Sequence, residues 1–223
     1  MNPFHTPELG KITAPSIVPS DHCKPYPRAE IEEMLRRWLQ ACADAETQGG
    51  DWTRTLAPFY HEQAQYHWNV GPHENFAAKN KQEILDVAVG YQMAGFEQWS
   101  YPYHDLIIDE QRGTVIGFWR QVSPHKRANG EQIVIEGLGG SWFQYAGNYQ
   151  WVWQHDFFDF GNAKEVFFEL AGMGKLQAEV KEKIHRQAKG ELLPGHVRLR
   201  PAPSLLHKGK NFAALLKVAL LGK

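Results

Sequence analysis

Residues 150–161 read Gln-Trp-Val-Trp-Gln-His-Asp-Phe-Phe-Asp-Phe-Gly, and this stretch decides the fold that we predict. Its aromatic and β-branched residues are typical of a β-strand. Successive side chains of a strand point to opposite faces. One face then carries Asp156 with three further residues, Val152, Gln154 and Phe158. The other face carries Trp151, Trp153, His155 and Phe157.

Asp156 is a carboxylic acid among mostly apolar neighbours in this predicted strand. Burial raises the pKa of a carboxyl group, which makes Asp156 a candidate general acid or base. Alternatively, Asp156 only accepts a hydrogen bond from a backbone group or ends the strand, and the stretch alone does not separate the two. His155 lies on the opposite face, so we do not predict it to be the catalytic base.

The composition is that of an ordinary globular chain. Of the 223 residues, 43% are hydrophobic and 22% are charged, and the formal net charge is -1. This balance gives no reason to expect binding to nucleic acid or to an anionic membrane. Aromatic residues reach 13%, including 8 Trp, which predicts a large core or an aromatic pocket.

Cys23 and Cys42 are the two cysteines, and they have no metal-ligand spacing. We therefore expect no structural zinc, and two cysteines fit a reducing compartment. The sequence begins without a signal-peptide pattern and has no long apolar run, so the predicted location is the cytoplasm.

Helical periodicity predicts four helices in the main part of the chain. An apolar stripe marks residues 28–48, and Asp51 begins a second helix that Pro58 keeps short. Residues 80–94 and 162–189 carry the third and fourth apolar stripes. Gly172 and Gly174 weaken the middle of the last one.

The predicted strands are one short strand at residues 64–70 and four later ones. The later strands span residues 98–108, 114–123, 132–145 and 149–160. Their short connections indicate an antiparallel sheet. Gly137, Gly139 and Gly140 predict a bulge or sharp bend inside the third of these strands, and hence a curved sheet.

The hairpin register predicts what lies beside Asp156. If Gly147 and Asn148 are the turn residues, Phe143 faces Val152, Ser141 faces Gln154 and Gly139 faces Asp156. Small residues beside the acid would leave room for a ligand. The predicted fold class is therefore α+β, with a curved antiparallel sheet wrapped around helices.

The chain divides into three predicted parts by composition. Residues 1–27 form a Pro-rich arm, residues 28–190 form the α+β domain, and residues 191–223 form a basic tail. The tail ends in an apolar stripe at residues 211–221, which predicts an amphipathic helix. We expect this helix to dock on protein, with a membrane surface as the alternative.

The order of these elements resembles the nuclear transport factor 2-like (NTF2-like) superfamily. Within it, residues 153–159, Trp-Gln-His-Asp-Phe-Phe-Asp, are similar to the closing motif of the SnoaL-like group. That group holds polyketide cyclases, limonene-type epoxide hydrolases and steroid-isomerase relatives. Over residues 28–173, the resemblance implies an α+β cone with a deep apolar pocket.

The resemblance also implies roles for three residues. Asp156 matches the catalytic aspartate, and Tyr66 matches a tyrosine that holds the reacting water in the epoxide hydrolases. Arg120 matches the arginine of an Arg-x-Asp pair, whose aspartate is Val122 here. Arg120 would lower the pKa of Asp156 if it reached it, against the effect of burial. The ligand-lining residues expected are Tyr60, Trp68, Tyr91, Trp119, Ser141, Phe143, Val152, Gln154 and Phe158.

Two functions remain open from the sequence. The first is a cofactor-independent isomerase, cyclase, dehydratase or hydrolase acting on an apolar substrate, with polycyclic and aromatic compounds as candidates. The alternative is a non-catalytic module that binds a small molecule or serves as a scaffold. We also predict a homodimer through the outer sheet face, where Trp142, Trp151 and Trp153 would lie, unless the Pro-rich arm covers them.

Overall fold

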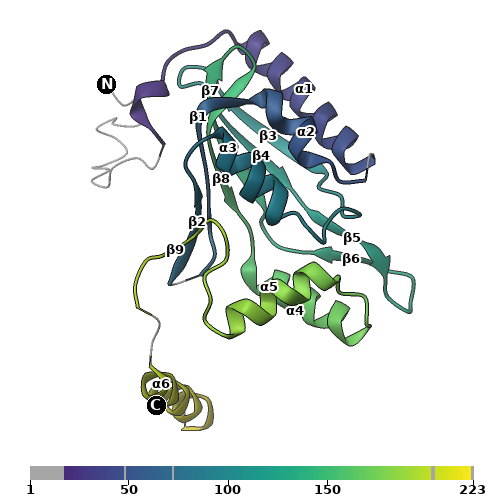
Figure 1. Cartoon of the computed structure of the whole chain (residues 1–223), viewed down its shortest axis with the longest axis vertical. Coiled ribbons are helices and arrows are strands. Elements are labelled where there is room, and N and C mark those ends of the chain that lie inside the picture. The colour runs from purple at the N-terminus through teal and green to yellow at the C-terminus, as the bar shows by residue number, and fades with distance from the viewer. Residues whose placement is uncertain (1–17, 48, 72, 202–203, 222–223) are drawn as a thin grey trace.

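The computed structural model describes residues 18–47, 49–71, 73–201 and 204–221. Figure 1 shows a strongly curved sheet with α1, α2 and α3 against one face and with α4 and α5 across one end. The helix α6 lies apart from the rest at the end of a connecting segment. The predicted α+β class with a curved sheet wrapped around helices is confirmed.

The main sheet within the described residues has seven strands, in the order β3-β4-β7-β8-β1-β2-β9. Their bounds are β1 Tyr60–Asn69, β2 Glu74–Ala78, β3 Tyr103–Asp109, β4 Thr114–Trp119, β7 Gly140–Gly147, β8 Gln150–Phe157 and β9 His196–Arg198. Neighbouring strands are antiparallel except β1 and β8, which are parallel. The strands β5 (Gln121–Lys126) and β6 (Gln132–Ile135) form a separate two-stranded sheet.

Three of the predicted strands are shorter or divided in the structure. The sheet bends at Gly137, whose φ is +93°, and this separates β6 from β7. A Cβ on Gly139 would lie 2.9 Å from the carbonyl oxygen of Trp119 at the end of β4. The backbone before β7 therefore approaches β4 too closely for a residue larger than glycine. The predicted bend is thus confirmed. The first of these strands begins only after Pro102, which has no backbone N–H to donate.

The strands around β1 differ most from the prediction. β1 begins at Tyr60 instead of residue 64, directly after the helical turn that contains Pro58. The stretch after it, for which the sequence pattern predicts no strand, contains β2, and the predicted basic tail contains β9. These short strands carry little periodic signal. They form because β2 pairs with β1 on one side and with β9 on the other, which buries Phe76 completely.

The β7–β8 hairpin turns at Asn148 and Tyr149, with φ values of +53° and +56°. Two left-handed residues make the tight turn that matches the twist of a hairpin. The predicted turn at residues 147–148 is therefore wrong by one residue, and each pair shifts by two. Ser141 consequently lies opposite Asp156. A shift of two keeps the predicted faces wherever the pairing is regular, which it is from Gly140 to Gln144.

A bulge in β8 changes the faces at the start of that strand. Gln144 pairs with Trp153 and Tyr145 pairs with Trp151, so Val152 is an extra residue in β8. Trp151 therefore points inward and is fully buried, whereas Val152 and Trp153 pack together on the outer face. The predicted faces of Trp151 and Val152 are both wrong for this reason.

The predicted helices are found with adjusted bounds. They are α1 Arg28–Thr47, α2 Trp52–Leu56, α3 Lys81–Glu83, its continuation as the π-helix η4 Ile84–Tyr91, α4 Phe160–Gly172, α5 Ala178–Ala188 and α6 Leu205–Leu221. The side chains of Asp51 and Asn80 cap α2 and α3 as their positions predict. The expected single helix at residues 162–189 is two helices, which separate beyond Gly172.

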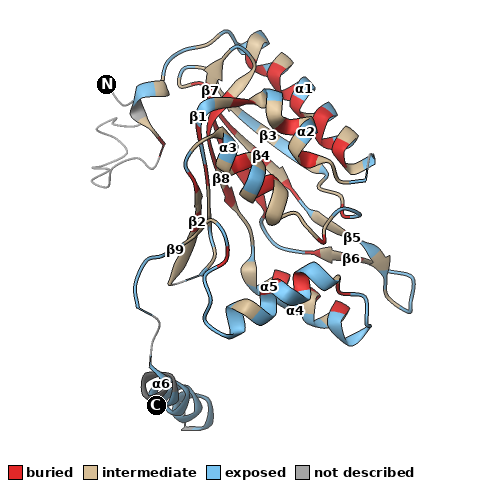
Figure 2. Cartoon of the chain, viewed as in Figure 1, coloured by how far each residue is buried: buried red, intermediate tan, exposed pale blue. Residues whose placement is uncertain are grey.

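The core lies between the concave face of the sheet and the helices (Figure 2). Trp38 of α1 stands edge-on to the rings of Tyr60, Phe143 and Trp151, at centroid distances of 5.5–6.2 Å. A second cluster, which includes Val166 and Ile133, fixes α4 against β6. These two clusters position the walls of the cavity described below.

The outer face of the sheet is partly covered by the N-terminal segment. Val18 packs on Val152 and Trp153, and the side chain of Gln144 donates to the carbonyl oxygen of His22. This contact matches the alternative that the Pro-rich arm covers outer-face tryptophans. Residues 1–17 of the arm lie outside the described residues.

The helix α6 is confirmed and begins earlier than the apolar stripe predicts. Its side chains from residue 209 to residue 220 are exposed, including Phe212, Leu215 and Leu220. Its docking on protein stays a prediction. None of the described helices combines the length and the apolar character that crossing a bilayer requires.

Candidate functional site

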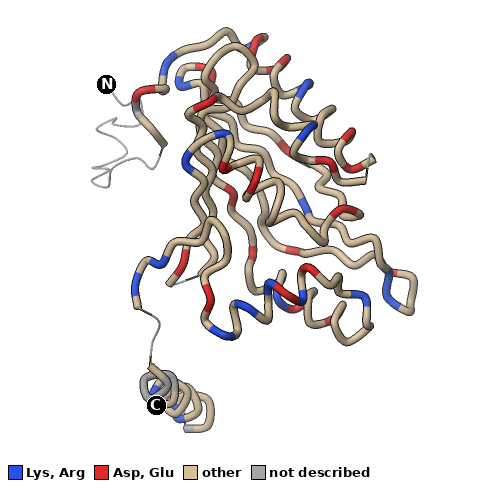
Figure 3. The backbone as a smooth tube through the Cα atoms, in the orientation of Figure 1, with Lys and Arg blue, Asp and Glu red and all other residues tan. Residues whose placement is uncertain are grey.

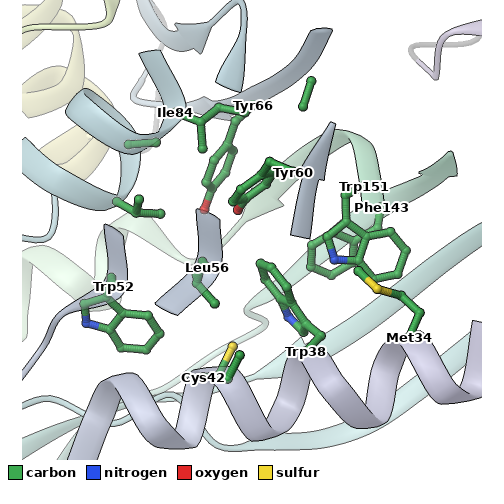
Figure 4. Packing of buried hydrophobic residues seen from close by; sticks show 14 of the residues in the cluster. Met34, Trp38, Cys42, Trp52, Leu56, Tyr60, Tyr66, Ile84, Phe143 and Trp151 are labelled. Carbon is green, nitrogen blue, oxygen red and sulfur yellow. The ribbon is translucent and has the colours of Figure 1, made fainter. Parts of the chain in front are cut away.

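A cavity of about 260 Å³ lies between the concave sheet face and the helices α1, α2, η4, α4 and α5. Most of its wall is apolar and aromatic. Figure 4 shows the rings of Tyr60 and Tyr66 side by side, with their hydroxyl groups directed toward α1 and its residues Trp38 and Cys42. The volume is close to the lower end of the usual range for ligand sites, about 300 Å³.

The polar groups of the sheet side converge on Asp156, which is 9% exposed. The phenol of Tyr66 donates a hydrogen bond to Asp156 Oδ2. The amide of Gln154 donates to Asp156 Oδ1 over 2.9 Å. Ser141, directly across the hairpin, is the third side chain that stabilises the carboxylate form.

A second layer of hydrogen bonds holds two of these donors in place. The phenol of Tyr60 donates to Gln154 Oε1 over 2.7 Å, so the Gln154 amide has its nitrogen turned toward Asp156. The indole of Trp119 donates to Ser141 Oγ over 2.8 Å, which holds the hydroxyl oxygen of Ser141 in place. The orientation of the donors is therefore fixed before any ligand enters.

Burial has the largest effect on the pKa of Asp156. Desolvation raises the pKa of Asp156 to about 6, although the hydrogen bonds from Tyr66, Gln154 and Ser141 each act to lower it. Burial also raises the pKa values of Tyr60 and Tyr66 well above their usual range, with the charge of Asp156 adding to the effect. Both phenols therefore stay neutral and act as hydrogen-bond donors.

The structure brings most of the predicted site residues together. Those that line the cavity are Tyr60, Tyr66, Trp68, Trp119, Ser141, Gln154, Asp156 and Phe158. Phe143 lies behind the wall, where it stacks on Trp151 at 4.6 Å between ring centroids. Tyr91 lies outside the lining, and its hydroxyl group accepts a hydrogen bond from Arg186. Val152 lies on the outer face because of the β8 bulge.

Arg120 does not reach the site. It follows β4, directly after the inward-facing Trp119, and its side chain is 52% exposed. There it forms an ion pair of 3.2 Å with Glu136. Arg120 therefore does not lower the pKa of Asp156 against the effect of burial.

Several wall residues carried no functional signal in the sequence. Trp38 and Cys42 belong to the apolar stripe of α1, which periodicity assigns to the core. The α5 residues Val180, Lys183 and Ile184 belong to the predicted helix at residues 162–189, whose pattern indicates only an apolar stripe. The one sign in the sequence is Lys183, which lies between Val180 and Ile184 at the spacing of the apolar stripe. In the described residues, no group of three His, Cys, Asp or Glu side chains is placed to hold a metal ion.

No protein-family model and no curated protein matches the sequence. Among solved structures, the chain is similar to PrhC from Penicillium brasilianum NBRC 6234, with 11% identity over 66% of this chain and 94% of that chain, at a TM-score of 0.46. It is similar to an NTF2-like protein from Anabaena variabilis ATCC 29413, with 12% identity, coverage of 60% and 92%, and a TM-score of 0.45. A provisionally named SnoaL-like polyketide cyclase from Jannaschia sp. CCS1 matches with 13% identity, coverage of 67% and 93%, and a TM-score of 0.42. The last two are described as NTF2-like and SnoaL-like, the groups that the sequence resembles. At these identities the likeness concerns the fold alone.

Proposed function

We propose that the protein is an enzyme that needs no cofactor and uses Asp156 as a general acid or base on an apolar small molecule. The observation that carries this proposal is a buried carboxyl group with a pKa of about 6, held by neutral donors in the wall of an apolar cavity. A group that titrates near the working pH can both accept and return a proton.

The hydrogen bonds around Asp156 leave room for one more partner. A carboxylate has about four lone-pair sites; Tyr66 and Gln154 occupy two of them, and Ser141 stabilises the carboxylate from across the hairpin. A remaining site can take a proton from a substrate C–H group or from a water molecule. The single O–H of Tyr66 is already donated to Asp156, so Tyr66 orients the carboxyl group and tunes its charge. Isomerisation, cyclisation, dehydration and hydrolysis all fit this arrangement.

The alternative is a binding module that holds a ligand in the same cavity without chemistry. The position of Arg120 favours it, because no cation from the sheet accompanies Asp156 to stabilise a developing charge. The two functions differ in turnover and not in affinity, so binding alone does not distinguish them.

The first experiment is a thermal-shift screen of apolar small molecules, because a ligand that binds the native state raises Tm. Compounds that bind are then tested for conversion, with Asp156→Asn as the variant and Asp159→Asn as the control. Asp159 caps α4 outside the cavity. We expect Asp156→Asn to keep ligand binding and to lose turnover by at least about a hundredfold. Turnover that Asp156→Asn leaves intact would favour chemistry elsewhere, and binding without any turnover would favour the binding module.

The proposed assembly is a homodimer through the outer face of the sheet. A row of directly opposed residues crosses this face on β3, β4, β7, β8 and β1, namely Ile107, Ile116, Trp142, His155 and His67. Ile107 is 53% exposed, and a row rich in apolar residues is suited to a second copy of the chain. Light scattering at micromolar concentration should give a dimer mass for the wild type and a monomer mass for Ile107→Glu. A monomer mass for the wild type would exclude the dimer.

A further inference from the structure

Lys183 is a buried cation in the wall of the cavity. Four residues of α5 line the cavity, Val180, Lys183, Ile184 and Gln187. Their spacing of three, four and seven residues places them on one face of the helix. Lys183 thus occupies the middle of a face that is otherwise suited to apolar residues, and only 7% of it is exposed.

The ammonium group of Lys183 is only partly satisfied by the protein. It donates to the carbonyl oxygens of Gln92 over 2.9 Å and Ala94 over 2.7 Å, just after η4. It also lies 5.2 Å from the ring centre of Tyr91 and 5.6 Å from that of Phe96. An ammonium group has three N–H donors, so the third remains after these two hydrogen bonds.

No carboxylate of the described chain lies within ion-pair distance of Lys183. Burial lowers its pKa to about 8, against the charges of Glu97, Glu179 and Glu182, which act to raise it. A buried cation without an anionic partner is costly, and an anion that enters the cavity would reduce this cost.

The cavity contains one carboxyl group and one ammonium group among its described lining residues. Among the described residues that line the cavity, Asp156 is the only Asp or Glu and Lys183 is the only Lys or Arg. Asp156 is held by side chains of β1, β7 and β8, whereas Lys183 is held by the chain that follows η4. The two groups form no ion pair with each other, so each can meet a different part of one ligand.

We propose that Lys183 binds the carboxylate of an apolar acid whose hydrocarbon part fills the cavity. One ammonium group with one remaining donor matches a single negative charge. A phosphate dianion would call for more donors, of the kind that an arginine fork supplies. The binding step stands on the α5 geometry, whereas the reaction of this acid at Asp156 rests on the proposed function.

Matched pairs of ligands test the inference directly. Isothermal titration at pH 7 would compare octanoate, cinnamate and 2-naphthoate with the primary alcohol of each skeleton. We expect at least one acid to bind the wild type about tenfold more tightly than its alcohol, a difference that corresponds to one charge-assisted hydrogen bond. Lys183→Met should lose this preference and still bind the alcohol within about twofold of the wild type.

Asp156→Asn is the control that separates this inference from the proposed function. It should keep the preference for the acid, whether or not it affects turnover. Equal affinity of acid and alcohol in the wild type would overturn the inference, and so would binding of none of the acids. An equal loss of both ligands in a folded Lys183→Met variant would also overturn it.

A second measurement needs no substitution of Lys183. A carboxylate that binds the ammonium group raises the pKa of Lys183, so binding at pH 8 should take up protons. The uptake would be measured by titration in two buffers of different ionisation enthalpy, in the Asp156→Asn background that removes the other cavity acid. The alcohol should give no uptake. An acid that binds without proton uptake would place its carboxylate away from Lys183.

Discussion

Tyr66 and Asp156 form a donor–acceptor pair across the parallel strands β1 and β8, with the phenol proton directed at the carboxyl oxygen Oδ2. Burial keeps Tyr66 neutral, so the donor persists through the physiological pH range. The hydrogen bond favours the ionised form of Asp156, while burial favours the protonated form. The balance between these two effects sets the pH range in which the site can transfer protons.

Tyr66→Phe should raise the pKa of Asp156, because it removes a donor that stabilises the carboxylate. We expect the acidic limb of a pH–rate or pH–affinity profile to move upward by about one pH unit. Tyr91→Phe is the matched control, because the Tyr91 hydroxyl group accepts from Arg186 and Tyr91 lies outside the cavity lining. Equal shifts in the two variants would show that Tyr66 acts through packing only.

The raised pKa of Asp156 predicts that this group makes the protein less stable as pH rises. The folded state binds more protons than the unfolded state between the unfolded value near 4 and the folded value of about 6. The contribution of Asp156 is therefore present below pH 4 and is lost as pH rises through 6. Two pKa units correspond to about 3 kcal/mol.

Urea denaturation of the wild type and Asp156→Asn at several pH values measures this contribution. The free energy of unfolding of the wild type should fall relative to the variant by about 3 kcal/mol between pH 4 and pH 7. A constant difference across this range would mean that Asp156 has an ordinary pKa in the folded protein.

Arg120→Ala should have little effect on either function or stability. The side chain is half exposed, and its ion pair with Glu136 is a surface interaction worth about 0–1 kcal/mol. We expect ligand affinity and turnover within about twofold of the wild type. A large loss of turnover would restore the role that the family resemblance implies for this residue.

Gly140→Ala should destabilise the protein by about 2 kcal/mol or more, as overpacking of a closely packed site does. A Cβ at this position would lie 2.6 Å from the carbonyl oxygen of Gly117 and 2.5 Å from the ring of Phe157. Gly172→Ala, at the end of α4, is the control because a Cβ there meets nothing within 4 Å. The control should be neutral or slightly stabilising in thermal denaturation.

Deletion of residues 204–223 should leave Tm within about 2 °C of the full chain, because the side chains of α6 from residue 209 to residue 220 are exposed. Figure 3 shows basic residues in this part of the chain, and the sequence has no acidic residue after Glu191. A deletion that begins at residue 193 should lower Tm clearly, because it removes β9 and the buried Leu193. Equal Tm values for the two deletions would show that β9 contributes little.

Local patterns in the sequence were enough to predict the inward position of Asp156, because alternation along a strand depends only on neighbouring residues. The position of Val152 could not be predicted, because the bulge arises from the pairing of β8 with β7. β2 and β9 were missed for a related reason, since three to five residues form strands only when partners lie beside them. Arg120 followed the family pattern in sequence but lies where the strand ends.

The buried position of Lys183 on α5 could not be predicted for a different reason. The apolar stripe of this helix could be recognised, and Lys183 stands within its spacing. The hydrogen bonds that keep its ammonium group inside come from residues about 90 positions earlier, just after η4. Such a partner is set by tertiary packing and cannot be read from the helix alone.

The parallel pairing of β1 with β8 has a consequence for folding kinetics. Tyr66 and Asp156 are separated by 90 positions, so their contact requires closure of a very long loop. Contacts of this kind form slowly, because the chain entropy is lost before the pairing compensates for it. The β7–β8 hairpin, by contrast, can form locally. We therefore expect Asp156 to remain hydrated, with an ordinary acidity, until the last strands meet, so that its change in acidity reports the final step of folding.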